Sequence, residues 1–278
     1  LSVSSGGRLT AVIGGVEGGD AHLAELVAAK VWVPVVTPAA DFTIDYANVP
    51  WVFRCFPSDA QQAEALVSHA QRRKYKRLYA VTEGDREGRT GLLRMEDACR
   101  KGGLTLSGLY EYVSHRPEAG RVPEDADAVV VWGRAESGLR VLRELRSGGY
   151  WGPVFGPATL LSHDLEEAGD SLGEVVVAAP YDPGDTDADF GRWFAHYVNE
   201  TGGEPDAVAV FAYDAARAVI AAIETGGPNR VRIRDALAEK RFDGLVGSYR
   251  FDELGGTTLR PVVVRLGEEG WEKADDGR

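Results

Sequence analysis

The chain has 278 residues, 44% of them hydrophobic and 27% charged, which is enough apolar material for one large core or two smaller ones. Its net charge is −12 and its Lys and Arg residues are scattered among acids, so the sequence argues against a nucleic-acid partner. No stretch reaches the roughly 20 apolar residues that a membrane-spanning helix needs.

Cysteine and histidine usage points away from disulfides and metals. Cys55 and Cys99 are the only cysteines, too few for a disulfide framework, and the five histidines have no metal-ligand spacing. We therefore expect two buried free thiols, no metal site and no cofactor.

The first part of the chain alternates between short apolar runs and amphipathic stretches. Apolar runs at 9–14, 31–38 and 77–84 flank helix-like stretches at 21–30 and 59–73. This alternation predicts a parallel sheet covered by helices.

The pattern continues with a second α/β unit. Helices are expected at 88–101 and 136–147, each closed by a Gly-Gly pair, with strands at 104–112, 128–133 and 153–156. After a polar loop at 181–189, two more helices are expected at 190–200 and 206–224. In residues 247–271, aromatic and β-branched residues alternate with polar ones on both sides of Gly255-Gly256. This pattern predicts two strands joined by a turn, and hence a terminal hairpin.

Five segments together suggest a family. They are AVIGGVEGGD (11–20), VPVVTPAAD (33–41), WVFRCFPSDAQQAEAL (51–66), FAYDAARAVIAAIETGG (211–227) and FDGLVGSYRFDELGG (242–256). In this order they resemble the type I periplasmic binding protein family, in its branch for branched-chain amino acids and amides. The third and fifth segments are the most specific, and the resemblance covers nearly the whole chain.

The resemblance implies an α/β fold of two Rossmann-like lobes with a ligand cleft between them. Lobe I would hold residues 1–74 and 183–246, and lobe II residues 75–182 and 247–278. The implied function is that of a solute-binding protein, not an enzyme, that captures a small organic ligand (an amino acid, amide or amine) for the membrane permease of an ABC-type transporter. The implied location is periplasmic or extracellular.

The sequence departs from the family at its start. Members normally have a strand, a helix and a second strand before the segment matching AVIG. We therefore expect a further N-terminal segment, or a partner chain, to complete lobe I, because the run at 9–14 would otherwise expose an apolar sheet edge.

Family ligands lie where strands end and helices begin, since helix N-termini hold carboxylates. In the loop after the first strand, Gly19 and Asp20 fall at such a place, with Asp20 where relatives carry a serine. Ala39 matches a backbone contact, and Asp41 and Glu87 replace a threonine and a tyrosine.

In lobe II the matching candidates are Trp132, Arg134, Ala158 and Thr159, and the glutamate with which some relatives hold a ligand ammonium is absent. The three acids of the other loops would favour a ligand that presents an amide or a cation. The alternative is that Asp20 and Asp41 cap helices and that Glu87 sits in a first turn, where a negative charge is favoured.

Two other functions remain open. The loop GGVEGGD (14–20), followed by Asp41, resembles a nucleotide-binding glycine loop of an α/β enzyme. Its spacing is not GxGxxG, however, and Asp20 would repel a pyrophosphate. The other alternative keeps the fold and makes the chain the ligand-sensing domain of a receptor or regulator.

Overall fold

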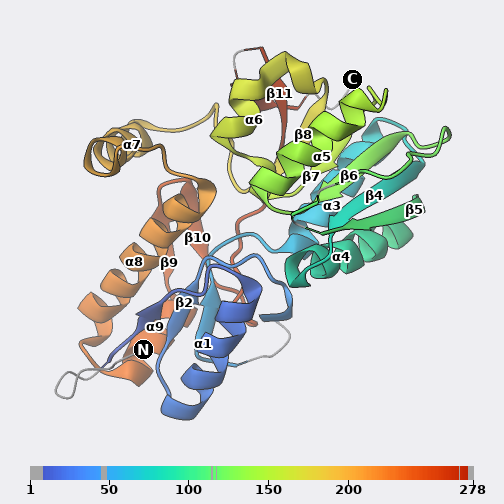
Figure 1. The fold of residues 1–278 in the computed structure, drawn as a ribbon. Coiled ribbons are helices and arrows are strands. Elements are labelled where there is room, and N and C mark those ends of the chain that lie inside the picture. Colours follow the sequence, from blue (N-terminus) through green and yellow to red (C-terminus); the bar gives the residue numbers. More distant parts are fainter. Residues whose placement is uncertain (1–8, 45–48, 114, 117, 269, 275–278) are drawn as a thin grey trace. The chain divides into compact units, whose positions relative to one another are not determined.

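The computed structural model describes residues 9–44, 49–113, 115–116, 118–268 and 270–274. The chain folds into two compact units (Figure 1). Unit 1 is formed by residues 1–57 and 208–259, and unit 2 by residues 58–207 and 260–278. Each unit is therefore described by itself.

Unit 1 contains a small parallel sheet. Its strands β1 (Val12–Ile13), β2 (Val35–Thr37) and β3 (Val52–Arg54) lie in the order β1-β2-β3. The other elements of this unit are α1 (Gly18–Val31), α8 (Ala207–Gly226), α9 (Arg230–Glu239) and the antiparallel pair β9 (Arg241–Gly244) and β10 (Gly247–Arg250).

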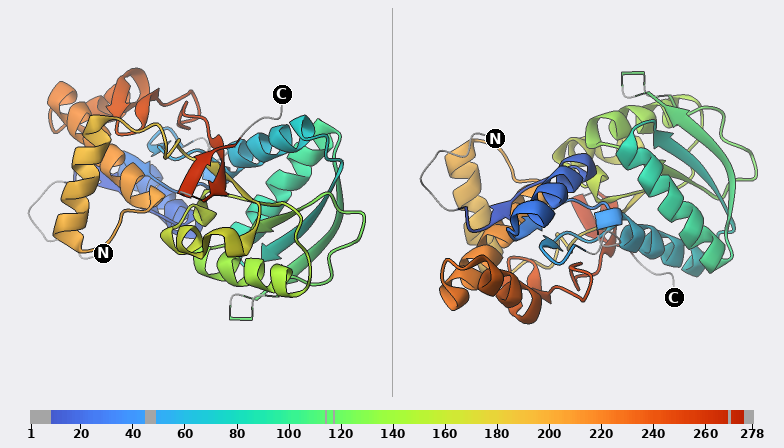
Figure 2. Two further views of the ribbon diagram at one scale, coloured as in Figure 1. Left: turned by 90° about the horizontal axis from the view of Figure 1, so that it is seen from above. Right: turned by 90° about the horizontal axis from the view of Figure 1, so that it is seen from below.

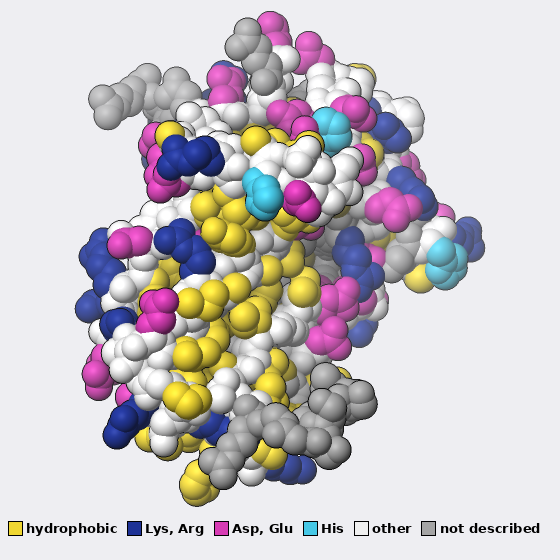
Figure 3. Space-filling model, turned by 90° about the vertical axis from the view of Figure 1, so that its left-hand side faces the viewer, with side chains coloured by type: hydrophobic (Ala, Val, Ile, Leu, Met, Phe, Trp, Pro, Cys, Tyr) yellow, Lys and Arg dark blue, Asp and Glu magenta, His cyan; other side chains and the backbone are white. Residues whose placement is uncertain are grey.

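Helix α1 presents its larger apolar side chains to the outside. Small Ala21 and Ala28 pack against the sheet, whereas Leu23, Leu26 and Val27 are 63%, 61% and 49% exposed. Figure 3 shows a further band of hydrophobic side chains on the side where α8 lies. Large apolar side chains that gather on an exposed surface often mark an interaction site, and Leu23, Leu26 and Val27 form such a patch on α1.

In the part of the chain that the structure describes, no strand pairs with the outer edge of β1. The backbone N–H groups of Val12 and Gly14 donate to Pro34 and Val36 at 2.9 and 3.1 Å. Because N–H groups alternate along a strand, that of Ile13 points away from β2. The strand therefore offers an edge to which another strand could add.

Unit 2 is built on a seven-stranded sheet in the order β12-β11-β8-β7-β6-β4-β5. Its strands are β4 (Arg77–Glu83), β5 (Thr105–Tyr112), β6 (Ala128–Trp132), β7 (Val154–Gly156), β8 (Val175–Ala179), β11 (Val262–Gly267) and β12 (Gly270–Lys273). The first five are mutually parallel, and β11 is antiparallel to both β8 and β12. Numbered along the chain, the parallel strands have the doubly wound order 2-1-3-4-5, which reverses direction between β4 and β6.

Helices cover both faces of this sheet, as Figure 2 shows for α4 and α5. The helices of the unit are α3 (Asp59–Arg72), α4 (Arg86–Gly102), α5 (Ala135–Ser147), α6 (His163–Ala168) and α7 (Ala188–Thr201). Alternate residues of β6 enter two different cores: Val129 and Val131 pack with α5, and Val130 and Trp132 with α3 and α4. Among the described residues, no helix is long and apolar enough to cross a membrane.

Local signals place the helix ends. Ser58 and Gln61 form a capping box at the start of α3, and α4 ends at Gly103, whose φ of +69° suits glycine. The α/β fold class expected from the sequence is confirmed. So are the helices at 59–73, 88–101, 136–147, 190–200 and 206–224, to within two residues at each end.

The expected terminal hairpin is wrong. Strand β10 pairs with β9, and β11 pairs with β8 and β12, so the two predicted strands belong to different sheets. Among the described residues, the two sides of the turn at Gly255-Gly256 are joined by the isolated bridge Phe251–Thr257 and by a few hydrogen bonds beside it, not by a pair of strands. Helices α3 and α7, which the sequence interpretation assigned to lobe I, lie in unit 2, where Leu66 and Ala70 of α3 pack with Leu78 and Val176.

Candidate functional site

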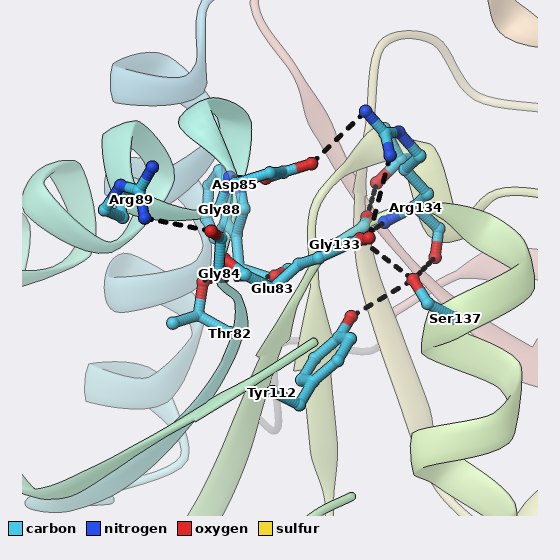
Figure 4. A network of polar contacts seen from close by, with 12 residues as sticks. Thr82, Glu83, Gly84, Asp85, Gly88, Arg89, Tyr112, Gly133, Arg134 and Ser137 are labelled. Atoms are coloured by element: carbon cyan, nitrogen blue, oxygen red, sulfur yellow. Dashed lines mark hydrogen bonds and ion pairs between the residues drawn. The ribbon is translucent and has the colours of Figure 1, made fainter. Parts of the chain in front are cut away.

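The strongest candidate site lies in unit 2, where the strand order reverses. In open α/β sheets, ligands bind at the carboxyl ends of the strands at such a point. Here the ends of β4, β5 and β6 bring together Glu83, Asp85, Tyr112, Arg134 and Ser137, which we call the switch-point cluster (Figure 4).

Glu83 is the buried anchor of this cluster, with only 1% of its surface exposed. Its Oε2 accepts hydrogen bonds from the backbone N–H of Arg134 at 3.1 Å and from the hydroxyl of Ser137 at 2.9 Å. Both donors belong to the N-terminus of α5, so the carboxylate occupies the place where that helix would attract an anion. The carboxylate of Glu83 therefore already compensates the positive end of the α5 dipole.

Tyr112 closes the inner side of the cluster. Its hydroxyl lies 3.1 Å from Ser137 Oγ, and burial, with the carboxylates of Glu83 and Asp85 adding to it, raises its pKa to about 12. The phenol is therefore neutral at physiological pH. Gly133 permits this approach, since a Cβ there would lie 2.1 Å from the Tyr112 hydroxyl oxygen.

Arg134 forms the outer side of the cluster, and half of its side chain is exposed (50%). Its Nη2 lies 3.2 Å from Asp85 Oδ2, and its Nη1 lies 3.7 Å from Glu83 Oε1. Asp85 also caps α4 by accepting from Gly88 N–H at 2.8 Å. One guanidinium thus joins the loops that follow β4 and β6.

The other residues predicted for lobe II have mixed positions. Thr159 is exposed, and its hydroxyl donates to Gly133 O at 2.6 Å, so it borders the cluster. The N–H of buried Ala158 donates to Gln62 Oε1 at 2.8 Å. Trp132 is a core residue, with its indole against Gly91 of α4.

Glu87, the third acid predicted from the sequence, lies in the first turn of α4 and is partly exposed. A carboxylate there is favoured by the helix dipole, as the capping alternative requires. The same turn carries Asp85, so two acids stand at this helix N-terminus.

In unit 1 the loops after β1 and β2 meet through Thr37. Its hydroxyl donates to Gly15 O at 2.5 Å and accepts from Ala39 N–H at 3.1 Å. Ala39 is fully buried. Gly19 and Asp20, at the start of α1, are both exposed, and a Cβ at Gly19 would meet open space.

Asp41 is already engaged by its neighbours. Its Oδ1 accepts from the N–H and the hydroxyl of Thr43 at 2.9 and 2.6 Å, and its Oδ2 lies 3.7 Å from His22 Nε2. The Nδ1 of His22 lies 2.6 Å from Glu25 Oε2. These contacts hold the Asp41 side chain within its own loop, and the helix that it was expected to cap lies outside the described residues.

Several of these residues were not predicted as site residues from the sequence. Glu83 is the last residue of β4 and Ser137 lies in the first turn of α5, and sequence patterns can indicate such positions. The hydrogen bond between them cannot be predicted from the sequence, because 54 positions separate the two residues. His22 stands in the first turns of α1, but its link to Thr43 depends on the loop that follows β2.

Other hollows and reactive groups are weaker candidates. A cavity of about 830 Å³ in unit 2 is lined by Glu174 and Trp271 near the amino end of β8, the end of the sheet where ligands rarely bind. Cys55 and Cys99 are both buried with free thiols, and burial raises the pKa of each. No group of three or more His, Cys, Asp or Glu side chains in the described part of the chain could hold a metal ion.

Comparison with known families decides the fold. The sequence matches the periplasmic binding protein family over residues 5–268. The chain belongs to this family. No curated protein sequence matches it.

Solved structures of the same fold agree with this membership. The ABC transporter substrate-binding protein from Desulfitobacterium hafniense in complex with Leu has a TM-score of 0.79 and 19% identity, over 95% of this chain and 80% of that one. A leucine binding protein from Thermotoga maritima has a TM-score of 0.79 and 20% sequence identity, over 95% of this chain and 79% of that one. A solute binding protein from R. palustris in complex with benzoate has a TM-score of 0.79 and 18% sequence identity, over 94% of this chain and 76% of that one.

Proposed function

We propose that this chain is the solute-binding component of an ABC-type transporter. It would capture a small organic solute, an amino acid, amide or amine, and deliver it to a membrane permease in a periplasmic or extracellular setting. The observation that carries the proposal is the switch-point cluster. It places Arg134, whose side chain is half-exposed, and the less exposed Asp85 at the carboxyl ends of the strands, in a family of binding proteins.

Calorimetry tests this function directly. The panel comprises neutral amino acids, their amides, diamines, arginine and aromatic carboxylates. We expect one of these classes to bind with a micromolar dissociation constant, and an Arg134→Ala variant to lose at least tenfold in affinity. Absence of binding across the panel, by a chain whose circular dichroism shows it folded, would refute the proposal.

The acids of unit 1 bear on the ligand's charge. Asp20 is exposed at the first turn of α1, whereas Asp41 is held by Thr43 and His22. A ligand that reaches this loop would meet Asp20 as the available acceptor, in the place where relatives carry a hydroxyl. An Asp20→Ser variant should then bind carboxylate ligands more tightly, and an Asp41→Thr variant should mainly lose stability.

Two alternatives are separable by simple measurements. A sensor would bind the same ligands but would not restore uptake when expressed with a permease and its ATPase. A nucleotide-dependent enzyme would gain melting temperature with NAD(P), through the loop at 14–20. Membership of a binding-protein family supports neither an active site nor a nucleotide site.

We also propose that a strand and a helix from a further segment cover the exposed face of unit 1. The added strand would pair with the free edge of β1, and the helix would pack on Leu23, Leu26 and Val27. The related structures are longer than this chain, which spans 76–80% of the three described above. Hydrogen exchange at Ile13 in the protein isolated from its own cells tests this: protection supports an added strand, and rapid exchange refutes it.

A further inference from the structure

The exposed guanidinium of the switch-point cluster is flanked by two carboxylates. Arg134 Nη2 lies 3.2 Å from Asp85 Oδ2, and Nη1 lies 3.7 Å from Glu83 Oε1 (Figure 4). With one positive and two negative charges, the group carries a net charge of about −1 when all three side chains are ionised. Its most exposed member is nevertheless the cation.

The two carboxylates have separable tasks. Glu83 is buried and accepts from the N-terminus of α5, so it fixes the position of that helix. Asp85 has 24% of its side chain exposed, and it reaches Arg134 with the oxygen that does not cap α4. The charge of Asp85 can therefore be removed while the buried anchor stays in place.

A ligand that approaches Arg134 meets both charges. A carboxylate is attracted by the guanidinium but repelled by Asp85 and Glu83, which lie within 4 Å of the same group. A carboxamide oxygen accepts a hydrogen bond from the guanidinium without that repulsion, and its NH₂ group can donate to a carboxylate. The arrangement thus suits an amide better than an acid of the same shape.

We propose that Asp85 determines specificity by holding Arg134, so that the switch-point cluster accepts carboxamides and discriminates against free carboxylates. This deepens the solute-binding function proposed above and rests on it. Asp85 acts through charge, and Arg134 makes the contact with the ligand.

The test uses two probes of one shape, 3-methylbutanamide and 3-methylbutanoate. Their binding is measured by calorimetry and by the NMR signal of the Arg134 side-chain Nε–H. We expect the wild type to bind the amide at least tenfold more tightly than the carboxylate. Asp85→Asn keeps an oxygen for capping α4, and should reduce this preference at least tenfold by strengthening carboxylate binding.

Asp97→Asn is the matched control. Asp97 pairs with Arg94 and Arg100 farther along α4, so its replacement removes the same charge from the same helix without touching the cluster. The amide preference should stay within twofold of the wild type. A similar change in both variants would mean that net charge alone is responsible and would overturn the inference.

The remaining outcomes also decide the matter. An unchanged preference in Asp85→Asn refutes the role of Asp85. If neither probe shifts the Arg134 signal at millimolar concentration in either protein, the cluster is not the contact and the inference fails. Binding of other solutes in the calorimetric panel would then leave the solute-binding function standing.

Discussion

Asp214 of α8 offers a sharp test of the energetics of unit 1. Its side chain is 1% exposed, and its Oδ1 and Oδ2 accept from Leu245 N–H at 2.9 and 3.1 Å. Burial raises its pKa from 3.8 to about 6, although the hydrogen bond from Leu245 and the charge of Arg217 act in the opposite direction. The folded protein therefore binds this proton more tightly than the unfolded chain does.

The sign of the pH dependence follows. The protonated carboxyl contributes its full stability below the unfolded pKa of 3.8, and this contribution is lost as the pH rises through about 6. Each pKa unit corresponds to about 1.4 kcal/mol, so ionised Asp214 costs about 3 kcal/mol of folding free energy at neutral pH. Most of that cost, about 2 kcal/mol, develops between pH 4.5 and 7.5.

Asp214→Asn removes the charge and keeps an oxygen for Leu245 N–H. In urea unfolding followed by circular dichroism, the variant should gain about 2 kcal/mol relative to the wild type between pH 4.5 and 7.5. Asp189→Asn, which removes an exposed acid of α7, should follow the wild type. A constant difference between Asp214→Asn and the wild type across this pH range would refute the reasoning.

Three further variants test other features. Gly91→Ala places a Cβ 1.9 Å from Trp132 Nε1, so it should destabilise unit 2 by about 1–3 kcal/mol and alter tryptophan fluorescence in thermal unfolding. Arg146→Met leaves four backbone carbonyls without their buried donor and should cost about 3 kcal/mol in urea unfolding, whereas a loss below about 1 kcal/mol would contradict this. Because exposed apolar patches promote association, we expect this chain to self-associate in light scattering and the double variant Leu23→Glu, Leu26→Lys to associate less; equal association of the two proteins would show that α1 is not the contact.

Much of the fold is readable from local signals. The capping box at Ser58 and the left-handed glycine at Gly103 mark helix ends that depend only on neighbouring residues. The alternation of apolar runs and helices likewise predicts a parallel sheet. These features need no knowledge of which strands become neighbours.

The sequence does not show which strands and side chains pair when they lie far apart along the chain. The strand at 262–267 has the same apolar pattern whether it pairs across the Gly255-Gly256 turn or with β8, and the structure shows the latter. Arg134 could be placed after a strand, but its contact with Asp85 depends on β4 lying beside β6. Whether Asp20 and Glu87 meet a ligand stays a prediction.

The division of the chain also bears on how the protein is made. Strands β4 to β8 of unit 2 come from one continuous stretch, residues 58–207, whereas unit 1 needs both residues 1–57 and residues 208–259. Since a nascent chain folds domain by domain from its N-terminus, the parallel core of unit 2 can form on the ribosome before α8 emerges. During that interval β1 to β3 and α1 have been synthesised, but α8 and α9 of the same unit have not. We therefore expect the first 57 residues to be the segment that most needs a chaperone during synthesis.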